Sequence, residues 1–364
     1  MGVLLKARAS RSLAYVYKPT MVAVILRVVP DTYVSPQRVK YVFLIDNSPS
    51  MKKETKLGTA ISAMQKLILE IPMGNQFEVY YFSNDLTKVY EGVTGGVTSY
   101  SFPVHYGGTT NLYKALSKLL DYLAKVDSPV RLVILSDGKP TDKRKPSDYD
   151  NLKVPSNVQT ISIGIGNDYN EVIMKKLADL GNGRFYHVTD VKTLPSIFEV
   201  EKIERVAAYN LRVAFPSGSE ILNYSGNPVV VPIVSDVVNV YAYLTVPPGE
   251  LASTVYITAT YVDPVDKSEK VFNIPLTFNR GPDSAVDSSV DQGVEDEVKY
   301  YYLIKLYAKK LEEGSKEATE VLKNLAELAA KTRREDLMAV TRKLSSGTDN
   351  KDLLAETTRV LRKG

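Results

Sequence analysis

The sequence predicts an α/β fold, in which a doubly wound and mostly parallel sheet is inserted in an antiparallel β-sandwich and followed by a C-terminal helical domain. Two observations predict this class. Buried-strand patterns alternate with amphipathic helices between residues 38 and 204, as in a parallel sheet with helices on both faces. On either side of this stretch, short alternating segments are separated by Pro and Gly turns, which is typical of antiparallel strands.

The central segment contains five expected strands with buried character and one partner strand. The segment Phe77–Phe82 and residues 87–91 are close enough in sequence to form a hairpin, whereas the other strands largely alternate with helices, which predicts a mostly parallel sheet. In chain order we expect strand 41–46, helix 55–71, strands 77–82 and 87–91, helix 111–126, strand 131–135, strand 158–166, helix 169–180 and strand 183–188.

The flanking segments complete the predicted organisation. An isolated hairpin is marginally stable in water, so the strands of residues 1–37 are expected to complete the sandwich formed by later strands. Residues 283–297 hold six acidic side chains and no basic one, which predicts a solvated linker. A stripe of four tyrosines lies beyond this segment and is more typical of core and helix packing than of a ligand site; the residues are Tyr300, Tyr301, Tyr302 and Tyr307. The expected domains are 1–37 (N-terminal strands of the sandwich), 38–204 (α/β domain), 205–282 (remainder of the sandwich), 283–297 (acidic linker) and 298–364 (helical domain).

Composition excludes several classes of function. The 364 residues are 44% hydrophobic and carry a net charge of only +4, so bulk charge gives no reason to expect nucleic-acid binding. There is no cysteine, which excludes disulfides, zinc thiolate sites and cysteine nucleophiles. The apolar run Met21–Leu26 ends at Arg27 and is too short for a membrane span, so a cytoplasmic location is expected.

Oxygen-bearing side chains follow the predicted strands at three places. Asp46, Ser48 and Ser50 follow strand 41–46, Thr110 precedes helix 111–126, and Asp137 follows strand 131–135. Each piece alone is equally typical of a helix cap or a turn. Parallel strands bring their carboxyl ends to one edge of a sheet, however, and carboxylates and hydroxyls are ligands that Mg²⁺ prefers.

This combination resembles the von Willebrand factor type A (vWA) domain and its metal-ion-dependent adhesion site (MIDAS), whose signature is D-x-S-x-S, then Thr, then S-D-G. The resemblance implies that Mg²⁺ or Mn²⁺ is held by Asp46, Ser48, Ser50, Thr110 and Asp137. Thr109 is a rival for the threonine position, although the helix register after Thr110 matches the family better. In this family a partner protein's acidic side chain completes the metal coordination, so the resemblance implies binding without catalysis.

The order of the domains is similar to that of the Sec23/Sec24 coat proteins and of multidomain vWA proteins of thermophilic archaea. Among the archaeal proteins is a regulator of the archaellum that pairs with a forkhead-associated (FHA) protein. This resemblance implies an FHA-domain partner, a Ser/Thr kinase and phosphorylation control. Exposed threonines near the C-terminus are the expected phosphorylation sites, and these candidates are Thr348, Thr357 and Thr358.

The sequence favours an intracellular scaffold or regulator over two other functions. A cell-surface or envelope adhesion protein that binds an acidic ligand through the metal is the alternative. A metal-dependent hydrolase needs a base, and the two histidines, His105 and His187, are better explained as structural or surface residues. Basic residues follow Asp137 closely and would suit an acidic or phosphorylated partner. Asp142 and Asp148 dilute their charge, however, which slightly favours an ordinary solvated loop; the basic residues are Lys139, Lys143, Arg144 and Lys145.

Overall fold

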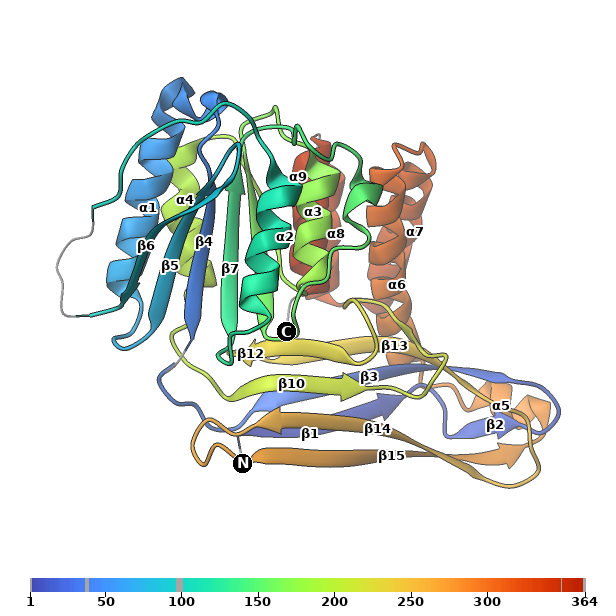
Figure 1. Cartoon of the computed structure of the whole chain (residues 1–364). Helices are drawn as coiled ribbons and strands as arrows, with labels where there is room; N and C mark the ends of the chain where they lie inside the picture. The colour runs from blue at the N-terminus through green and yellow to red at the C-terminus, as the bar shows by residue number, and fades with distance from the viewer. Residues whose placement is uncertain (1, 37–38, 96–100, 348, 363–364) are drawn as a thin grey trace. The chain divides into compact units, whose positions relative to one another are not determined.

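The computed structural model describes residues 2–36, 39–95, 101–347 and 349–362 (Figure 1). Two compact units divide the chain. The first contains Met1–Thr32, Leu211–Val230 and Asp236–Gly364, and the second contains Tyr33–Asn210 and Val231–Ser235. Within the described residues, no helix combines the length and apolar character that a membrane crossing requires.

The second unit is built on a six-stranded sheet with the order β6-β5-β4-β7-β8-β9. Strands β4, β5, β7, β8 and β9 run parallel, and β6 pairs with β5 in the antiparallel direction, which confirms the predicted hairpin. The strands are β4 (Lys40–Asp46), β5 (Gln76–Phe82), β6 (Leu86–Val93), β7 (Val130–Ser136), β8 (Val158–Ile165) and β9 (Phe185–Val188).

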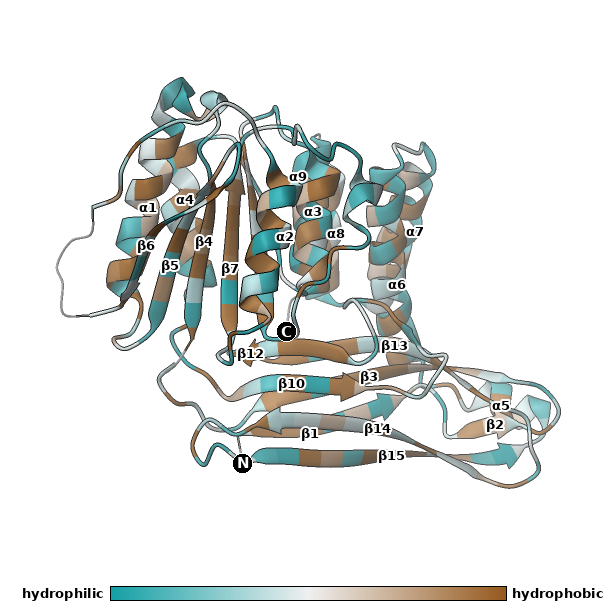
Figure 2. Cartoon of the chain, in the orientation of Figure 1, coloured by the Kyte–Doolittle hydropathy of each residue, from teal (hydrophilic) through white to brown (hydrophobic). Residues whose placement is uncertain are grey.

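Helices cover both faces of this sheet (Figure 1). Every residue of β4 and β7 is buried, which explains why both strands are almost continuously hydrophobic in sequence and appear largely brown in Figure 2. The helices are α1 (Lys56–Glu70), α2 (Leu112–Leu123), α3 (Glu171–Leu180) and α4 (Leu194–Glu201), with 3₁₀ turns η1 (Pro49–Thr55), η2 (Pro146–Tyr149) and η3 (Val191–Thr193).

Strands from both ends of the chain share the other two sheets. Strand β3 pairs with β1 on one side and with β13 on the other, with Leu26 opposite Val240. The sheet orders are β1-β3-β13-β11 and β12-β10-β14-β15-β2. The strands are β1 (Val3–Ala9), β2 (Leu13–Tyr15), β3 (Thr20–Pro30), β10 (Ala208–Ala214), β11 (Glu220–Ile221), β12 (Val229–Val234), β13 (Val238–Val246), β14 (Ser253–Val262) and β15 (Glu269–Gly281).

The C-terminal helices pack on one of these sheets. Tyr301 of α6 stacks on Tyr241 of β13 with ring centroids 3.7 Å apart, and Ile25 and Ile304 belong to the same buried cluster. Tyr300, Tyr301 and Tyr307 are buried, which confirms their predicted packing role, whereas Tyr302 is exposed. The helices are α5 (Asp283–Ser288), α6 (Gln292–Glu312), α7 (Glu317–Thr332), α8 (Glu335–Ser346) and α9 (Asn350–Leu361).

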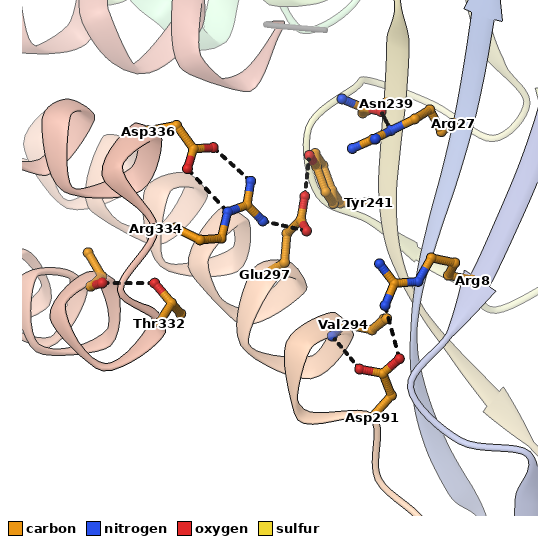
Figure 3. Close-up of polar contacts among 11 residues, drawn as sticks. Arg8, Arg27, Asn239, Tyr241, Asp291, Val294, Glu297, Thr332, Arg334 and Asp336 are labelled. Carbon is orange, nitrogen blue, oxygen red and sulfur yellow. Dashed lines mark hydrogen bonds and ion pairs between the residues drawn. The ribbon is translucent and has the colours of Figure 1, made fainter.

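The prediction that residues 283–297 form an acidic linker is wrong, because this segment contains α5 and the start of α6. Val286 and Val294 are fully buried, so apolar contacts hold the segment on the protein despite its charge. Asp291 caps α6 by accepting a hydrogen bond from Val294 N at 3.2 Å and pairs with Arg8 at 3.0 Å (Figure 3).

We expect Asp291→Ala to lower the free energy of unfolding by about 1 kcal/mol, because the first turn of α6 loses its side-chain acceptor. Asp291→Asn retains an acceptor oxygen and loses only the exposed pairing with Arg8, so it should retain most of the stability. Urea unfolding of the two variants measures the difference. An equal loss in both would show that the cap is not the source of the stability.

Candidate metal centre

The candidate site begins at the end of β4. Asp46 is the last residue of this strand and is fully buried. Its Oδ1 accepts a hydrogen bond from Ser48 N at 2.8 Å, and its Oδ2 accepts one from Ser136 Oγ at 2.6 Å. Burial raises the pKa of Asp46 and the nearby Asp137 carboxylate adds to this rise, whereas the hydrogen bonds from Ser136 and Ser48 oppose it; the net result is a pKa of about 6. The two hydrogen bonds, one to each carboxylate oxygen, fix the position of the Asp46 side chain.

Asp137 joins the site from the end of the adjacent strand. Strands β4 and β7 are parallel neighbours, and both end at the same edge of the sheet (Figure 1). Ser50 Oγ donates to Asp137 Oδ1 at 2.6 Å, and the hydroxyl oxygens of Ser48 and Ser50 lie 2.9 Å apart. Hydrogen bonds thus connect four of the five predicted ligands directly, from Asp46 to Ser48, from Ser48 to Ser50 and from Ser50 to Asp137.

Thr110, the fifth predicted ligand, lies close to the other donors, and the surroundings of Gly138 show this. A methyl group built on Gly138 would lie 3.4 Å from Thr110 Oγ1, 3.5 Å from Ser50 Oγ and 3.8 Å from Asp46 Oδ2. Oxygens from three separate segments therefore surround one small space. Thr109 Oγ1 donates to Asn84 Oδ1 at 2.9 Å instead, so its hydroxyl is engaged elsewhere.

The chemistry of these donors fits a hard divalent cation. Oxygens of Asp46, Ser50 and Thr110 lie close to one position in front of Gly138, and hydrogen bonds connect Ser48 and Asp137 to Ser50. Two carboxylates and three hydroxyls are thus grouped, and such oxygen donors suit Mg²⁺ or Mn²⁺. Over the described ranges, no three side chains of His, Cys, Asp or Glu cluster in a way that could hold a metal, so this hydroxyl-rich set differs from a histidine or thiolate centre.

Sequence reasoning missed one charged residue of the site. Lys56, the first residue of α1, is only 9% exposed, and its Nζ lies 3.0 Å from Asp137 Oδ2. A lysine at the start of an amphipathic helix resembles any solvated residue in the sequence. The only sequence signal that Lys56 belongs to the site is its position six residues after Ser50.

The other polar residues that the sequence singled out are the two histidines, which contact other rings, and basic residues that follow the donors in the chain. The His187 ring hydrogen-bonds to Tyr169 OH at 2.6 Å, and the exposed His105 ring packs against Tyr81 with centroids 5.3 Å apart. The basic side chains that follow Asp137 are exposed, as are two lysines that follow Ser50. These six residues, called the basic rim below, are Lys52, Lys53, Lys139, Lys143, Arg144 and Lys145.

The expectation of exposed threonines near the C-terminus is wrong for two of the three candidates. Thr357 and Thr358 are fully buried in α9, and their hydroxyls donate to Leu354 O and Ala355 O, both at 2.8 Å. A threonine hydroxyl satisfied by a carbonyl of the preceding turn can face a helix interface without loss of a hydrogen bond. Thr348 lies outside the described residues.

Comparisons with known proteins agree with this architecture. The von Willebrand factor type A domain profile matches residues 42–200, and the profile of the Archaellum regulatory network B (ArnB) C-terminal domain matches residues 292–363. A search of curated proteins gives no match.

Three solved structures resemble the chain over most of its length. A von Willebrand factor type A protein from Catenulispora acidiphila is 18% identical with a TM-score of 0.72, over 99% of this chain and 96% of that one. Human Sec24c of the COPII coat is 10% identical with a TM-score of 0.52, over 90% of this chain and 57% of that one. Both similarities concern the fold.

The ArnB paralog VWA2 from Sulfolobus acidocaldarius is 43% identical to this chain, with a TM-score of 0.94 over 100% of this chain and 98% of that one. The chain therefore belongs to the ArnB-related family of von Willebrand factor type A proteins.

Proposed function

We propose that this protein is a regulatory interaction protein that binds Mg²⁺ or Mn²⁺ and, through the metal, an acidic side chain of a partner protein. The residues that would hold the ion are Asp46, Ser48, Ser50, Thr110 and Asp137. When bound, the ion supplies an electrophilic position that an incoming carboxylate can occupy. The observation that carries this proposal is the convergence of donor oxygens on the space in front of Gly138.

The basic rim supports an acidic partner. Its six side chains are exposed and lie on the 3₁₀ turn η1, which carries Ser50, and on the loop that follows Asp137. Positive charge around a binding site accelerates association with an acidic surface and disfavours basic partners. We propose binding rather than turnover, because the His105 ring packs on Tyr81 and the His187 ring is hydrogen-bonded to Tyr169, so neither is held on the donor cluster.

We propose further that the protein acts in the cytoplasm in archaellum regulation, with an FHA-domain protein as partner and a Ser/Thr kinase controlling the pairing. The match to the ArnB C-terminal domain and the 43% identity to VWA2 support this assignment. We also propose that the vWA domain is inserted in a β-sandwich, which the pairing of β3 with β13 supports. The domain limits given in the sequence analysis are part of the same proposal, except for the linker at 283–297, which the structure replaces with α5 and the start of α6.

The test is affinity capture from native lysate with and without phosphatase treatment, using wild type, Asp46→Ala and Gly138→Ala. Asp46→Ala removes a ligand, and Gly138→Ala places a methyl group between three donor oxygens without changing their chemistry. We expect both variants to bind Mg²⁺ about 10–100-fold more weakly and to lose a partner that wild type retains. Phosphatase treatment should release any partner whose binding depends on phosphorylation.

Gly58→Ala is the matched control, because a methyl group built on Gly58 in α1 meets no atom within 4 Å. This variant should bind Mg²⁺ and partners as wild type does. Identical sets of partners in all variants, before and after phosphatase treatment, would refute both the metal-dependent and the phosphate-dependent parts of the proposal.

A further inference from the structure

The ion pair between Lys56 and Asp137 is unusual because it lies inside the candidate metal centre. The lysine side chain is 11% exposed and the aspartate side chain 0% exposed, with Nζ 3.0 Å from Oδ2. Asp137 Oδ1 already accepts the hydrogen bond from Ser50. Both oxygens of this carboxylate are therefore engaged by protein groups.

The surroundings of Lys56 keep its ammonium group at this position. In the part of the chain that the structure describes, Asp137 is the acidic side chain with which Lys56 forms an ion pair. The backbone at Gly166 makes room for it, since a methyl group there would lie 3.2 Å from Lys56 Nζ. Gly166 also has a positive φ of 73°, so a larger residue would be strained.

A buried charge requires a partner of opposite sign. Lys56 is this partner for Asp137. The carboxylates of Asp46 and Asp137 together carry a formal charge of −2, and the charge of Lys56 brings the sum to −1. A divalent cation bound to Asp137 would share that carboxylate with the ammonium group, and two positive charges at such short range repel each other. The same lysine thus stabilises the site without an ion and weakens the binding of an ion.

We propose that Lys56 is an internal counter-ion of the metal centre, which pairs with Asp137 in the absence of a divalent cation and lowers the affinity of the centre for that cation. This inference rests on the proposed function. It makes occupancy of the site depend on the concentration of the divalent cation, whereas the fold itself remains stable without metal.

The experiment measures Mn²⁺ binding to the full-length protein by the loss of the free Mn²⁺ signal in electron paramagnetic resonance, with competition by Mg²⁺. We expect Lys56→Gln to bind Mn²⁺ about tenfold or more tightly than wild type. In EDTA its unfolding midpoint should fall, because Asp137 loses its counter-ion, and added Mg²⁺ should restore the midpoint. Lys56→Arg keeps the charge and should show the wild-type affinity.

Lys66→Gln is the matched control, since Lys66 is exposed on the same helix and its loss changes the net charge equally. Unchanged Mn²⁺ affinity in Lys56→Gln, with binding abolished in Asp46→Ala, would overturn the counter-ion role and leave the proposed function intact. Absence of Mn²⁺ binding in both wild type and Lys56→Gln would overturn the metal site itself. If Lys56→Gln is unfolded in EDTA, folding on addition of Mn²⁺ supports the inference. Failure of both Lys56→Gln and Lys56→Met to fold with Mn²⁺ overturns it.

Discussion

Glu201→Gln is expected to lower the free energy of unfolding of the vWA domain by about 3–5 kcal/mol, the usual cost of leaving buried charges without their partner. Glu201 ends α4 and is 4% exposed. It accepts from Arg131 at 2.5 Å, from Arg184 at 3.0 Å and from Tyr186 OH at 2.5 Å. Loss of its charge leaves the buried Arg131 without this counter-ion. Urea unfolding, followed by the fluorescence of the many tyrosines, measures the change.

The same carboxylate gives a pH dependence of known sign. Burial alone would raise the pKa of Glu201, but the charges of Arg184 and Arg131 and the Tyr186 hydrogen bond outweigh it, so the pKa lies below its usual value. The ionised carboxylate therefore contributes stability above the unfolded-state pKa of about 4.3, and this contribution is lost as the pH falls through the lower folded-state pKa. The stability difference between wild type and Glu201→Gln should shrink over that acidic range.

Glu199→Gln is the matched control on the same helix. Glu199 is exposed and pairs with Lys202 at 2.9 Å, an arrangement that contributes little in water. The control should therefore unfold like wild type at every pH. A Glu201→Gln protein as stable as wild type at neutral pH would show that the buried network is not a source of stability.

Much of the fold could be predicted because local pattern and burial agree. Residues 41–45 are continuously apolar, and the structure buries all of them at the centre of the parallel sheet. The grouping of Asp46 and Asp137 follows from that sheet, since the parallel strands that they follow or end have their carboxyl ends at one edge. The metal that these residues would hold stays a prediction.

Residues whose environment depends on distant contacts could not be predicted. Lys56 has the local pattern of a solvated helix start, and only the position of Asp137, 81 residues later, gives it a buried partner. The acid content of residues 283–297 indicated solvent, yet buried Val286 and Val294 outweigh it. Thr357 and Thr358 are polar in sequence, but their hydroxyls are satisfied within the helix. In each case tertiary packing overrode composition.

The burial of Thr357 leads to the second large effect. Thr357→Glu is expected to destabilise the helical region by about 3–5 kcal/mol, because it places an unpaired carboxylate at a fully buried position. Leu354 and Val360, which lie three residues before and after Thr357 in α9, are buried as well. Thermal unfolding and limited proteolysis of the full chain measure the loss.

Thr319→Glu is the control, since Thr319 is exposed on α7 and its replacement should leave unfolding unchanged. The comparison also bears on phosphorylation. A phosphate carries more charge than a glutamate, so a kinase could modify Thr357 only after α9 has opened, and the modified helix would then resist closing. A Thr357→Glu protein that is as stable and as resistant to protease as Thr319→Glu would show that α9 accommodates charge at this position, and Thr357 would then regain its place as a phosphorylation candidate.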